Sequence, residues 1–140
     1  LRSGGDSEPA EQLGDIIHAF GLVSVQIDVE GSLPDDTRIA AAFLQIIREA
    51  STNATKHAQA HQVQVRLWQE APDGCAVARM TISNDGAPAP VSYREGTGIP
   101  GMRHVAQDLG GSLEVRAAPP FTLEVSIPLS PDVTVQRRSS

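Results

Sequence analysis

The segment REASTNATKHAQA, residues 48–60, closes a long run with helical spacing of apolar residues. Glu49 and Asn53 are four residues apart, so on a helix one side chain lies above the other. Lys56 and His57 follow on the next turn. At about 100° per residue, these four side chains share one arc of the helix surface. An acid, an amide, an ammonium group and an imidazole are therefore presented together.

An apolar stripe runs beside this polar arc. Its residues recur every three or four positions, namely Ile39, Phe43, Ile46, Ala50 and Ala54. The spacing predicts an amphipathic helix from about Asp36 to Ala58, capped by Asp35 or Asp36. A merely solvated face would usually lie opposite the core stripe and would be richer in Lys, Glu and Gln. A helix shoulder that holds no ligand is the alternative that the helix alone leaves open.

The polar arc suits the binding of a polyphosphate together with a metal ion. A hard cation such as Mg²⁺ prefers oxygen ligands, which the Asn53 carboxamide and the Glu49 carboxylate supply. Lys56 offers a point charge for phosphate oxygens.

Composition limits the classes of protein to consider. The 140 residues, 40% of them hydrophobic, are enough for one domain with a real core. A net charge of −6 argues against a nucleic-acid surface. No apolar run approaches the ~20 residues that cross a bilayer, so we expect no membrane contact. Cys75 is the only cysteine, which fits a reducing, cytoplasmic compartment. Because no initiator Met is present, we expect a fragment of a longer protein.

The remaining periodicities predict an α+β fold. Helices are expected at residues 10–20 and 101–109, and strands at 22–30, 61–70, 75–83, 112–117 and 122–128. Strands outnumber helices and come in hairpins, which indicates a two-layer sandwich with helices on one face of a mixed, mostly antiparallel sheet. The domain is expected to span residues 10–129, between a flexible segment at 1–9 and a disordered tail at 130–140.

Two glycine-containing stretches frame an aperiodic loop, residues 84–100. EGTGIPGM, residues 95–102, runs into a predicted helix, and glycines there let backbone N–H groups approach a phosphate. It is not a Walker loop, because no Gly-Lys-Ser/Thr follows. Asn84-Asp85-Gly86 ends a predicted strand, where a polar side chain can face a ligand base. Plain turns are the alternative for each stretch taken alone.

Taken together, these motifs resemble the ATP-binding catalytic domain of sensor histidine kinases, in the superfamily of gyrase, Hsp90 and MutL. REASTNATKHA resembles the N box, ISNDG the first glycine box, and EGTGIPGMRHVAQDLGG the second glycine box. The last has the form found in the subfamily that pairs with NarL-type response regulators. The resemblance covers residues 13–129 and implies a Bergerat-type α/β sandwich that binds ATP and Mg²⁺.

The resemblance also implies roles for individual residues. It implies that Asn53 and Glu49 bind the metal ion. It also implies that Asn53, Glu49 and Lys56 take part in catalysis. Contacts to ATP fall to Asn53, Lys56, His57, Asn84, Gly86, Gly96, Thr97, Gly98, Ile99, Met102 and Thr122. Of these, Gly86 allows close approach to adenine, Gly96 and Gly98 present amides to the phosphates, and Thr122 would lie at the floor of the adenine pocket.

The sequence departs from the family pattern at three positions. Asn84 stands where the family has the adenine-reading Asp, Pro88 replaces the last glycine of that box, and Phe121 replaces the glycine expected before Thr122. Because an Asn oxygen carries no charge, its hydrogen bond to adenine should be weaker than that of Asp. Asp85 is the alternative reader, but neighbouring side chains on a strand face opposite ways.

Three functions follow from these motifs as hypotheses. The first is a histidine kinase domain that transfers the ATP γ-phosphoryl group to a His on a separate dimerisation domain, which then passes phosphate to a response regulator receiver domain. The second is a Ser kinase of the anti-sigma type, with the same fold. The third is a degenerate nucleotide-binding interaction module. None of the four histidines, His18, His57, His61 and His104, lies in the family's acceptor setting. The parent protein of such a domain often carries a membrane anchor.

Overall fold

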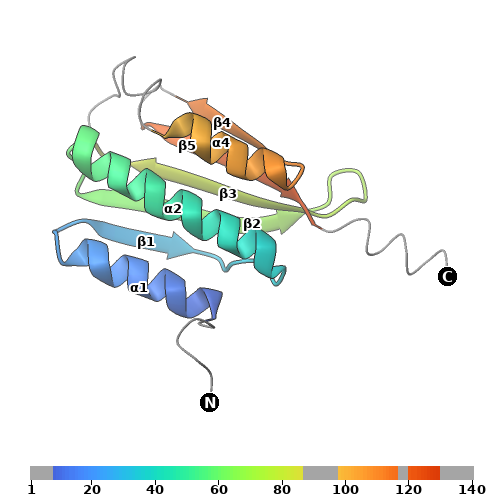
Figure 1. The fold of residues 1–140 in the computed structure, drawn as a ribbon, viewed down its shortest axis with the longest axis horizontal. Helices are drawn as coiled ribbons and strands as arrows, with labels where there is room; N and C mark the ends of the chain where they lie inside the picture. Colours follow the sequence, from blue (N-terminus) through green and yellow to red (C-terminus); the bar gives the residue numbers. More distant parts are fainter. Residues whose placement is uncertain (1–7, 87–97, 117–119, 130–140) are drawn as a thin grey trace.

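The structure is a computed structural model that describes residues 8–86, 98–116 and 120–129. In chain order the elements are α1 (Pro9–Gly21), β1 (Gln26–Glu30), α2 (Thr37–His57), β2 (Gln62–Glu70), β3 (Val77–Asn84), α4 (Ile99–Asp108), β4 (Ser112–Arg116) and β5 (Thr122–Pro128) (Figure 1). The expected flexible start and disordered tail, apart from Glu8 and Pro9, lie outside the described residues.

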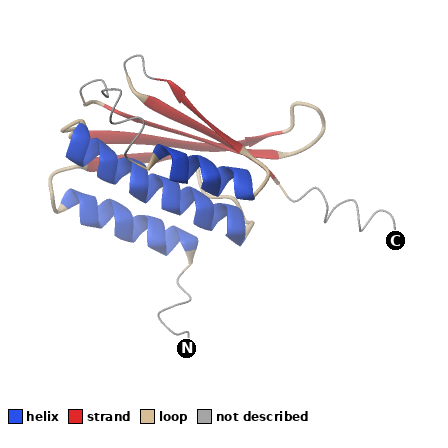
Figure 2. Cartoon of the chain, turned by 45° about the horizontal axis from the view of Figure 1, so that its top comes forward, coloured by secondary structure: helices blue, strands red, loops and turns tan. Residues whose placement is uncertain are grey.

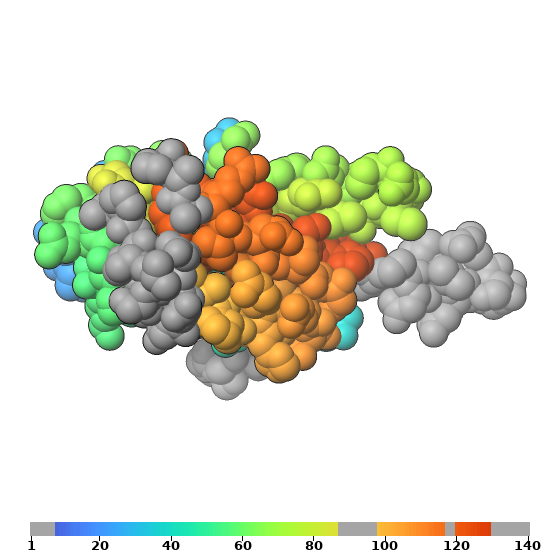
Figure 3. Space-filling view, turned by 90° about the horizontal axis from the view of Figure 1, so that it is seen from above, coloured from blue at the N-terminus to red at the C-terminus, as the bar shows by residue number. Residues whose placement is uncertain are grey.

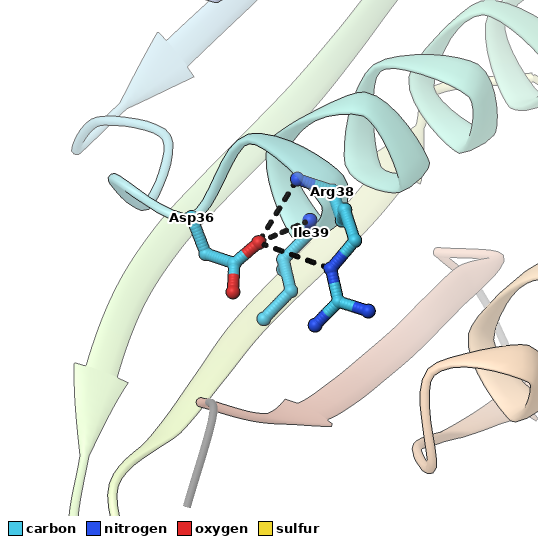
Figure 4. Close-up of polar contacts among 3 residues, drawn as sticks. All are labelled: Asp36, Arg38 and Ile39. Atoms are coloured by element: carbon cyan, nitrogen blue, oxygen red, sulfur yellow. Dashed lines mark hydrogen bonds and ion pairs between the residues drawn. The ribbon is translucent and has the colours of Figure 1, made fainter. Parts of the chain in front are cut away.

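The beginning of α2 is set by its cap. The Asp36 carboxylate accepts hydrogen bonds from the backbone N–H groups of Arg38 at 2.9 Å and Ile39 at 3.3 Å (Figure 4). The first turn of a helix leaves N–H groups without intrahelical partners, and an Asp at the cap position satisfies them. Of the two candidate caps in the sequence, Asp36 is therefore the one that the structure uses.

Five strands form one sheet in the order β1-β2-β3-β5-β4. β1 pairs with β2 in parallel, and the other pairings are antiparallel. The helices that the structure describes, α1, α2 and α4, lie together on one face of this sheet (Figure 2). The predicted fold class, a two-layer sandwich on a mixed and mostly antiparallel sheet, is confirmed.

The core lies between the helices and the sheet. From α2 it takes the apolar stripe, including Phe43, Ile46 and Ile47, which have no exposed surface. From the strands it takes every second residue, such as Met80 on β3 and Ile127 on β5. Burial of an aliphatic or aromatic side chain of this size contributes about 1.5–3 kcal/mol. The alternation therefore fixes which face of each strand meets the helices.

The opposite face of the sheet is open and carries charged side chains. Trp68 lies there, with the Arg66 guanidinium 5.9 Å from the centre of its ring. Arg79 forms an ion pair with Glu70 across the β2–β3 pair. None of the helices that the structure describes has the length and apolarity needed to cross a bilayer.

The predicted strand at 22–30 is wrong in its first half. Val25 donates its backbone N–H to the Phe20 carbonyl at 3.0 Å, and Ser24 has a positive φ of 67°. These residues form a turn that closes α1, and the strand begins at Gln26. The alternation of apolar and polar residues continued through the turn, so the pattern alone did not show where pairing starts.

Candidate functional site

The C-terminal half of α2 supplies four predicted site residues. Asn53 is buried, with 4% of its surface exposed, whereas Glu49, Lys56 and His57 are exposed. An amide buried on a helix face must form polar contacts, because an unsatisfied buried amide costs about 1–3 kcal/mol. The helix therefore turns its carboxamide inward and leaves its charged groups accessible beside it.

The start of α4 meets this part of α2. Gly98 precedes α4 with a left-handed backbone, φ 94°. A Cβ built on Gly98 would lie 2.8 Å from Oε2 of Glu49, so the glycine backbone lies against the Glu49 carboxylate. Two motifs that are far apart in the sequence are thus adjacent in space. In Figure 1, the C-terminal end of α2, the end of β3 and the start of α4 lie at the same end of the molecule.

The same helix start has the features of an anion site. Its first backbone N–H groups lack intrahelical partners, and the helix dipole places positive partial charge there. Ile99 and Met102, in the first turn, are buried at 3% and 2% exposure, so they anchor α4 to the core. In the space-filling view, α4 and β4 form a broad gold-to-orange face (Figure 3). Predicted site residues Gly96 and Thr97 lie outside the described residues.

The side chain of Asn84, at the end of β3, also faces the helix layer. Asn84 pairs with Val63, which has no exposed surface, and directly opposed residues on antiparallel strands face the same side. Oδ1 of Asn84 accepts a hydrogen bond from the Gly86 N–H at 2.8 Å. A Cβ on Gly86 would lie 2.5 Å from the Cβ of Ala58, so only glycine fits there. Gly86 thus lets the end of β3 approach the C-terminal end of α2.

Asp85 has a different partner from Asn84. Its Oδ1 accepts hydrogen bonds from the backbone N–H groups of His61 at 2.9 Å and Gln62 at 3.0 Å. The His61 N–H, followed by that of Gln62, lowers the pKa of the Asp85 carboxyl below its usual value, against a smaller opposing effect of desolvation. Asp85 therefore fastens the end of β3 to the start of β2. This function was missed in the sequence, although an Asx residue after a strand is a frequent acceptor for backbone N–H groups.

Thr122 does not join the site. It pairs with Ser83, the neighbour of Asn84, and therefore faces the open side of the sheet. Its hydroxyl donates to the Pro120 carbonyl at 2.8 Å. Phe121, at 6% exposure, belongs to the core cluster under the helices. The expectation that Thr122 forms the floor of an adenine pocket is wrong, because the alternation on β5 turns its side chain away.

The few oxygen ligands on α2 suit Mg²⁺. They are too few for a metal ion that is bound by protein side chains alone. Among the described residues no group of three or more His, Cys, Asp or Glu could hold an ion. Mg²⁺ usually takes one or two protein oxygens, and phosphate oxygens and water complete its shell. The buried Asn53 carboxamide and the Glu49 carboxylate one turn before it are the residues that could hold it here.

Comparison with known proteins identifies the family of the chain. The family described as "Histidine kinase-, DNA gyrase B-, and HSP90-like ATPase" matches residues 39–131. The chain is 29% identical over 100 residues to the signal transduction histidine-protein kinase/phosphatase UhpB of Salmonella typhimurium strain LT2. That alignment spans 71% of this chain and 19% of the relative, so the chain corresponds to about a fifth of UhpB.

Solved structures show the same fold. The blue-light activated histidine kinase of Erythrobacter litoralis EL346 superposes with a TM-score of 0.65 at 25% identity, over 85% of this chain and 44% of that one. The ATP binding domain of PrrB from Mycobacterium tuberculosis has a TM-score of 0.63 at 17% identity, over 84% and 91% of the two chains. The second likeness speaks for the fold alone. UhpB and the Erythrobacter litoralis EL346 protein are histidine kinases. With the family match over residues 39–131, the chain belongs to the histidine kinase-, DNA gyrase B- and HSP90-like ATPases.

Proposed function

We propose that this domain binds Mg·ATP between the C-terminal half of α2 and the start of α4, as the catalytic part of a sensor histidine kinase. The observation that carries the proposal is the contact between Gly98 and the Glu49 carboxylate, with Asn53 buried one turn further along α2. This contact joins a pair of oxygen ligands for a metal to a helix start suited to phosphate.

Each group has a distinct part in the proposed site. Asn53 and Glu49 hold the ion, which when bound neutralises charge on the phosphate oxygens. Lys56 and the backbone N–H groups near Gly98 bind the phosphates, and Asn84 faces the base. Ile99 and Met102 form apolar walls. The residues of this chain therefore position the nucleotide and neutralise charge, the two contributions on which phosphoryl transfer mainly depends.

The proposed acceptor is a His on a dimerisation domain elsewhere in the longer protein. Its imidazole nitrogen forms a bond to the γ-phosphorus while the bond to the β–γ bridging oxygen breaks and ADP leaves. The imidazole is already a nucleophile, so this domain needs to supply no strong base. From there we propose transfer to an Asp of a response regulator receiver domain. Use of ATP places this domain on the cytoplasmic side, whether or not the parent is anchored in a membrane.

The test is a thermal titration of the domain with Mg·ATP. Ligand at 100 times its Kd stabilises a protein by about 2.7 kcal/mol, so the midpoint should rise with concentration. Asn53→Ala should abolish most of this rise. Gln45→Ala, on the exposed face of the same helix, is the matched control and should leave it unchanged. Equal Mg·ATP binding by wild type and Asn53→Ala would refute the proposed metal-binding role of Asn53.

The acceptor residue is tested separately. The domain is incubated with radiolabelled Mg·ATP and a helical dimerisation domain that carries a His, and the product is then treated with acid. Phosphohistidine is lost in acid, whereas phosphoserine survives. Acid-stable label on the acceptor would favour a Ser kinase of the anti-sigma type. Binding of Mg·ATP without any transfer to a His or Ser acceptor would favour a nucleotide-binding interaction module.

A further inference from the structure

A pocket lies on the open face of the sheet, which the described helices leave uncovered (Figure 2). Its volume is about 200 Å³, below the ~300–1,000 Å³ of typical small-molecule sites, so it suits a side chain of a polypeptide. Trp68 on β2 is among the residues that line it, and its side chain is 39% exposed. The proposed nucleotide site lies on the helix side of the sheet, so this pocket is a separate surface.

The charged side chains of this pocket are incompletely paired. Arg79 forms an ion pair with Glu70, and Arg116 forms one with Glu124 at 2.6 Å. Glu114 lies directly opposite Glu124 on the β4–β5 pair, where like charges repel each other. Among the residues that the structure describes, none forms an ion pair with Glu114. The β4 side of the pocket therefore has an excess of negative charge, which suits a basic side chain.

The chain leaves the sheet beside this pocket. Pro128, at the end of β5, pairs with Val77 on β3, and Val77 pairs with Glu70, which lines the pocket. Beyond Leu129 the sequence continues with SPDVTVQRRSS, residues 130–140, which lie outside the described residues. Two adjacent arginines thus follow closely on the strand that forms part of the pocket.

This segment is long enough to reach back across the pocket. Arg137 follows Leu129 by eight residues, which span at most about 29 Å when extended. Glu124 precedes Leu129 by five residues, about 17 Å along β5, and Glu114 lies one strand further, about 5 Å away. Pro131, near the start of the segment, is a residue type that favours turns.

We propose that residues 130–140 turn back over the open face of the sheet and that Arg137 or Arg138 pairs with Glu114. The segment then enters the pocket and reduces the access of solvent to Trp68. Because the arginines belong to the same chain, their effective concentration at the pocket is on the order of millimolar, so a contact too weak to join separate molecules forms here. The tail expected from the sequence is thereby anchored by one ion pair.

Trp68 is the only tryptophan of the chain, so its fluorescence reports on this pocket. The experiment measures the quenching of this fluorescence by acrylamide in the full 140-residue chain and in the double variant Arg137→Gln/Arg138→Gln. At low salt, we expect the Stern–Volmer constant of the variant to be at least about 1.5-fold higher, because the wild-type ion pair is formed most of the time. At about 1 M salt, where charges are screened beyond about 3 Å, the difference should disappear.

Variants of the pocket test the partner of the arginines. Glu114→Gln should raise the constant as much as the arginine variant does, and the two changes combined should raise it no further. Glu11→Gln, on the exposed face of α1, is the matched control for the loss of one negative charge and should change nothing. Glu114→Arg together with Arg137→Glu and Arg138→Glu should restore the wild-type value, because the charges are exchanged.

Equal quenching of the wild type and the arginine variant at low salt would overturn the proposal. A Glu114→Gln variant with the wild-type constant would overturn it as well. Protection of Trp68 that develops only as the protein concentration rises would identify a second copy of the chain as the occupant, and would also refute docking of the chain's own segment. These outcomes are independent of Mg·ATP binding, which concerns the other face of the sheet.

Discussion

Asp85 and Asn84 are adjacent residues whose side chains make unrelated contacts. The Asp85 carboxylate accepts the N–H groups of His61 and Gln62, and Asn84 bonds Gly86. Consecutive strand residues face opposite sides, so one residue can anchor the turn while the next faces the site. The position of the proposed base reader thus depends on a residue that need not touch the ligand.

We predict that Asp85→Ala lowers the free energy of unfolding by about 1 kcal/mol at neutral pH, because two backbone N–H groups lose their acceptor. The pKa of Asp85 is lowered from 3.8 in the folded state. Its charged form is thus stabilising above that value, and the stabilisation is lost as the pH falls through the folded pKa. The difference between wild type and variant should therefore shrink in acid. Urea denaturation at neutral pH and at about pH 2 measures it.

Asp73→Ala, in the exposed β2–β3 turn, is the control and should change little at either pH. A difference for Asp85→Ala that grows as the pH falls would contradict the role given to its charge.

Gly98 has a left-handed backbone and also lies against the Glu49 side chain. Its φ of 94° lies in the left-handed region, where a side chain costs about 1–2 kcal/mol, and an added Cβ would meet Glu49 at 2.8 Å. We predict that Gly98→Ala destabilises the domain by about 1 kcal/mol and weakens Mg·ATP binding. Gly101→Ala is the contrast, because nothing lies within 4 Å of its added Cβ. If calorimetry gave both variants wild-type affinity, the contact of Gly98 with Glu49 would be irrelevant to binding.

At the scale of elements, α2 depends on its cap. Asp36→Ala should cost about 0.5–2 kcal/mol, because the N–H groups of Arg38 and Ile39 lose their acceptor. The Arg38–Asp36 ion pair, at 3.9 Å and with the Arg38 side chain 70% exposed, should add little. Equilibrium unfolding in urea measures the loss, with Asp35→Ala as the neighbouring control. Equal losses for the two variants would show that general charge near the helix start, not the cap, is responsible.

The elements were predictable where periodicity was long, and less so where turns intervene. The helical spacing from Ile39 to Ala54 placed α2 closely, and the strand predicted at 75–83 lies within two residues of β3 at its start and one at its end. The start of β1 was misplaced because a local hydrogen bond from Val25 to Phe20 competes with strand pairing. Local turns of this kind leave no trace in an apolar alternation.

The face of Thr122 could have been found from the sequence. Leu123, Val125 and Ile127 alternate, so a residue directly before them must face the other side. The resemblance to a family motif instead predicts that Thr122 faces the adenine pocket, which this alternation contradicts. In contrast, the contact between Gly98 and Glu49 could only be expected from the family, because it joins elements that are far apart in the chain and depends on how α4 packs on α2.

At the scale of the whole molecule, stability depends on the layer between helices and sheet. Phe43 has no exposed surface and belongs to the main core cluster. We predict that Phe43→Ala costs about 3–5 kcal/mol, a large part of the ~5–15 kcal/mol available to a domain. Ala41→Ser, on the exposed side of the same helix, should stay within about 0.5 kcal/mol. Urea denaturation gives both values, and similar small losses would show that α2 is not the centre of the core.

The order of the strands has a consequence for the behaviour of the domain in concentrated solution. The two outermost strands, β1 and β4, are five residues each, against nine, eight and seven for the inner three. Both carry acidic or basic side chains, among them Asp28, Glu30, Glu114 and Arg116. Short edge strands with charged side chains are poor templates for pairing with a strand from another molecule. Strands of a second molecule should therefore pair poorly with β1 or β4, which protects the domain against edge-to-edge aggregation.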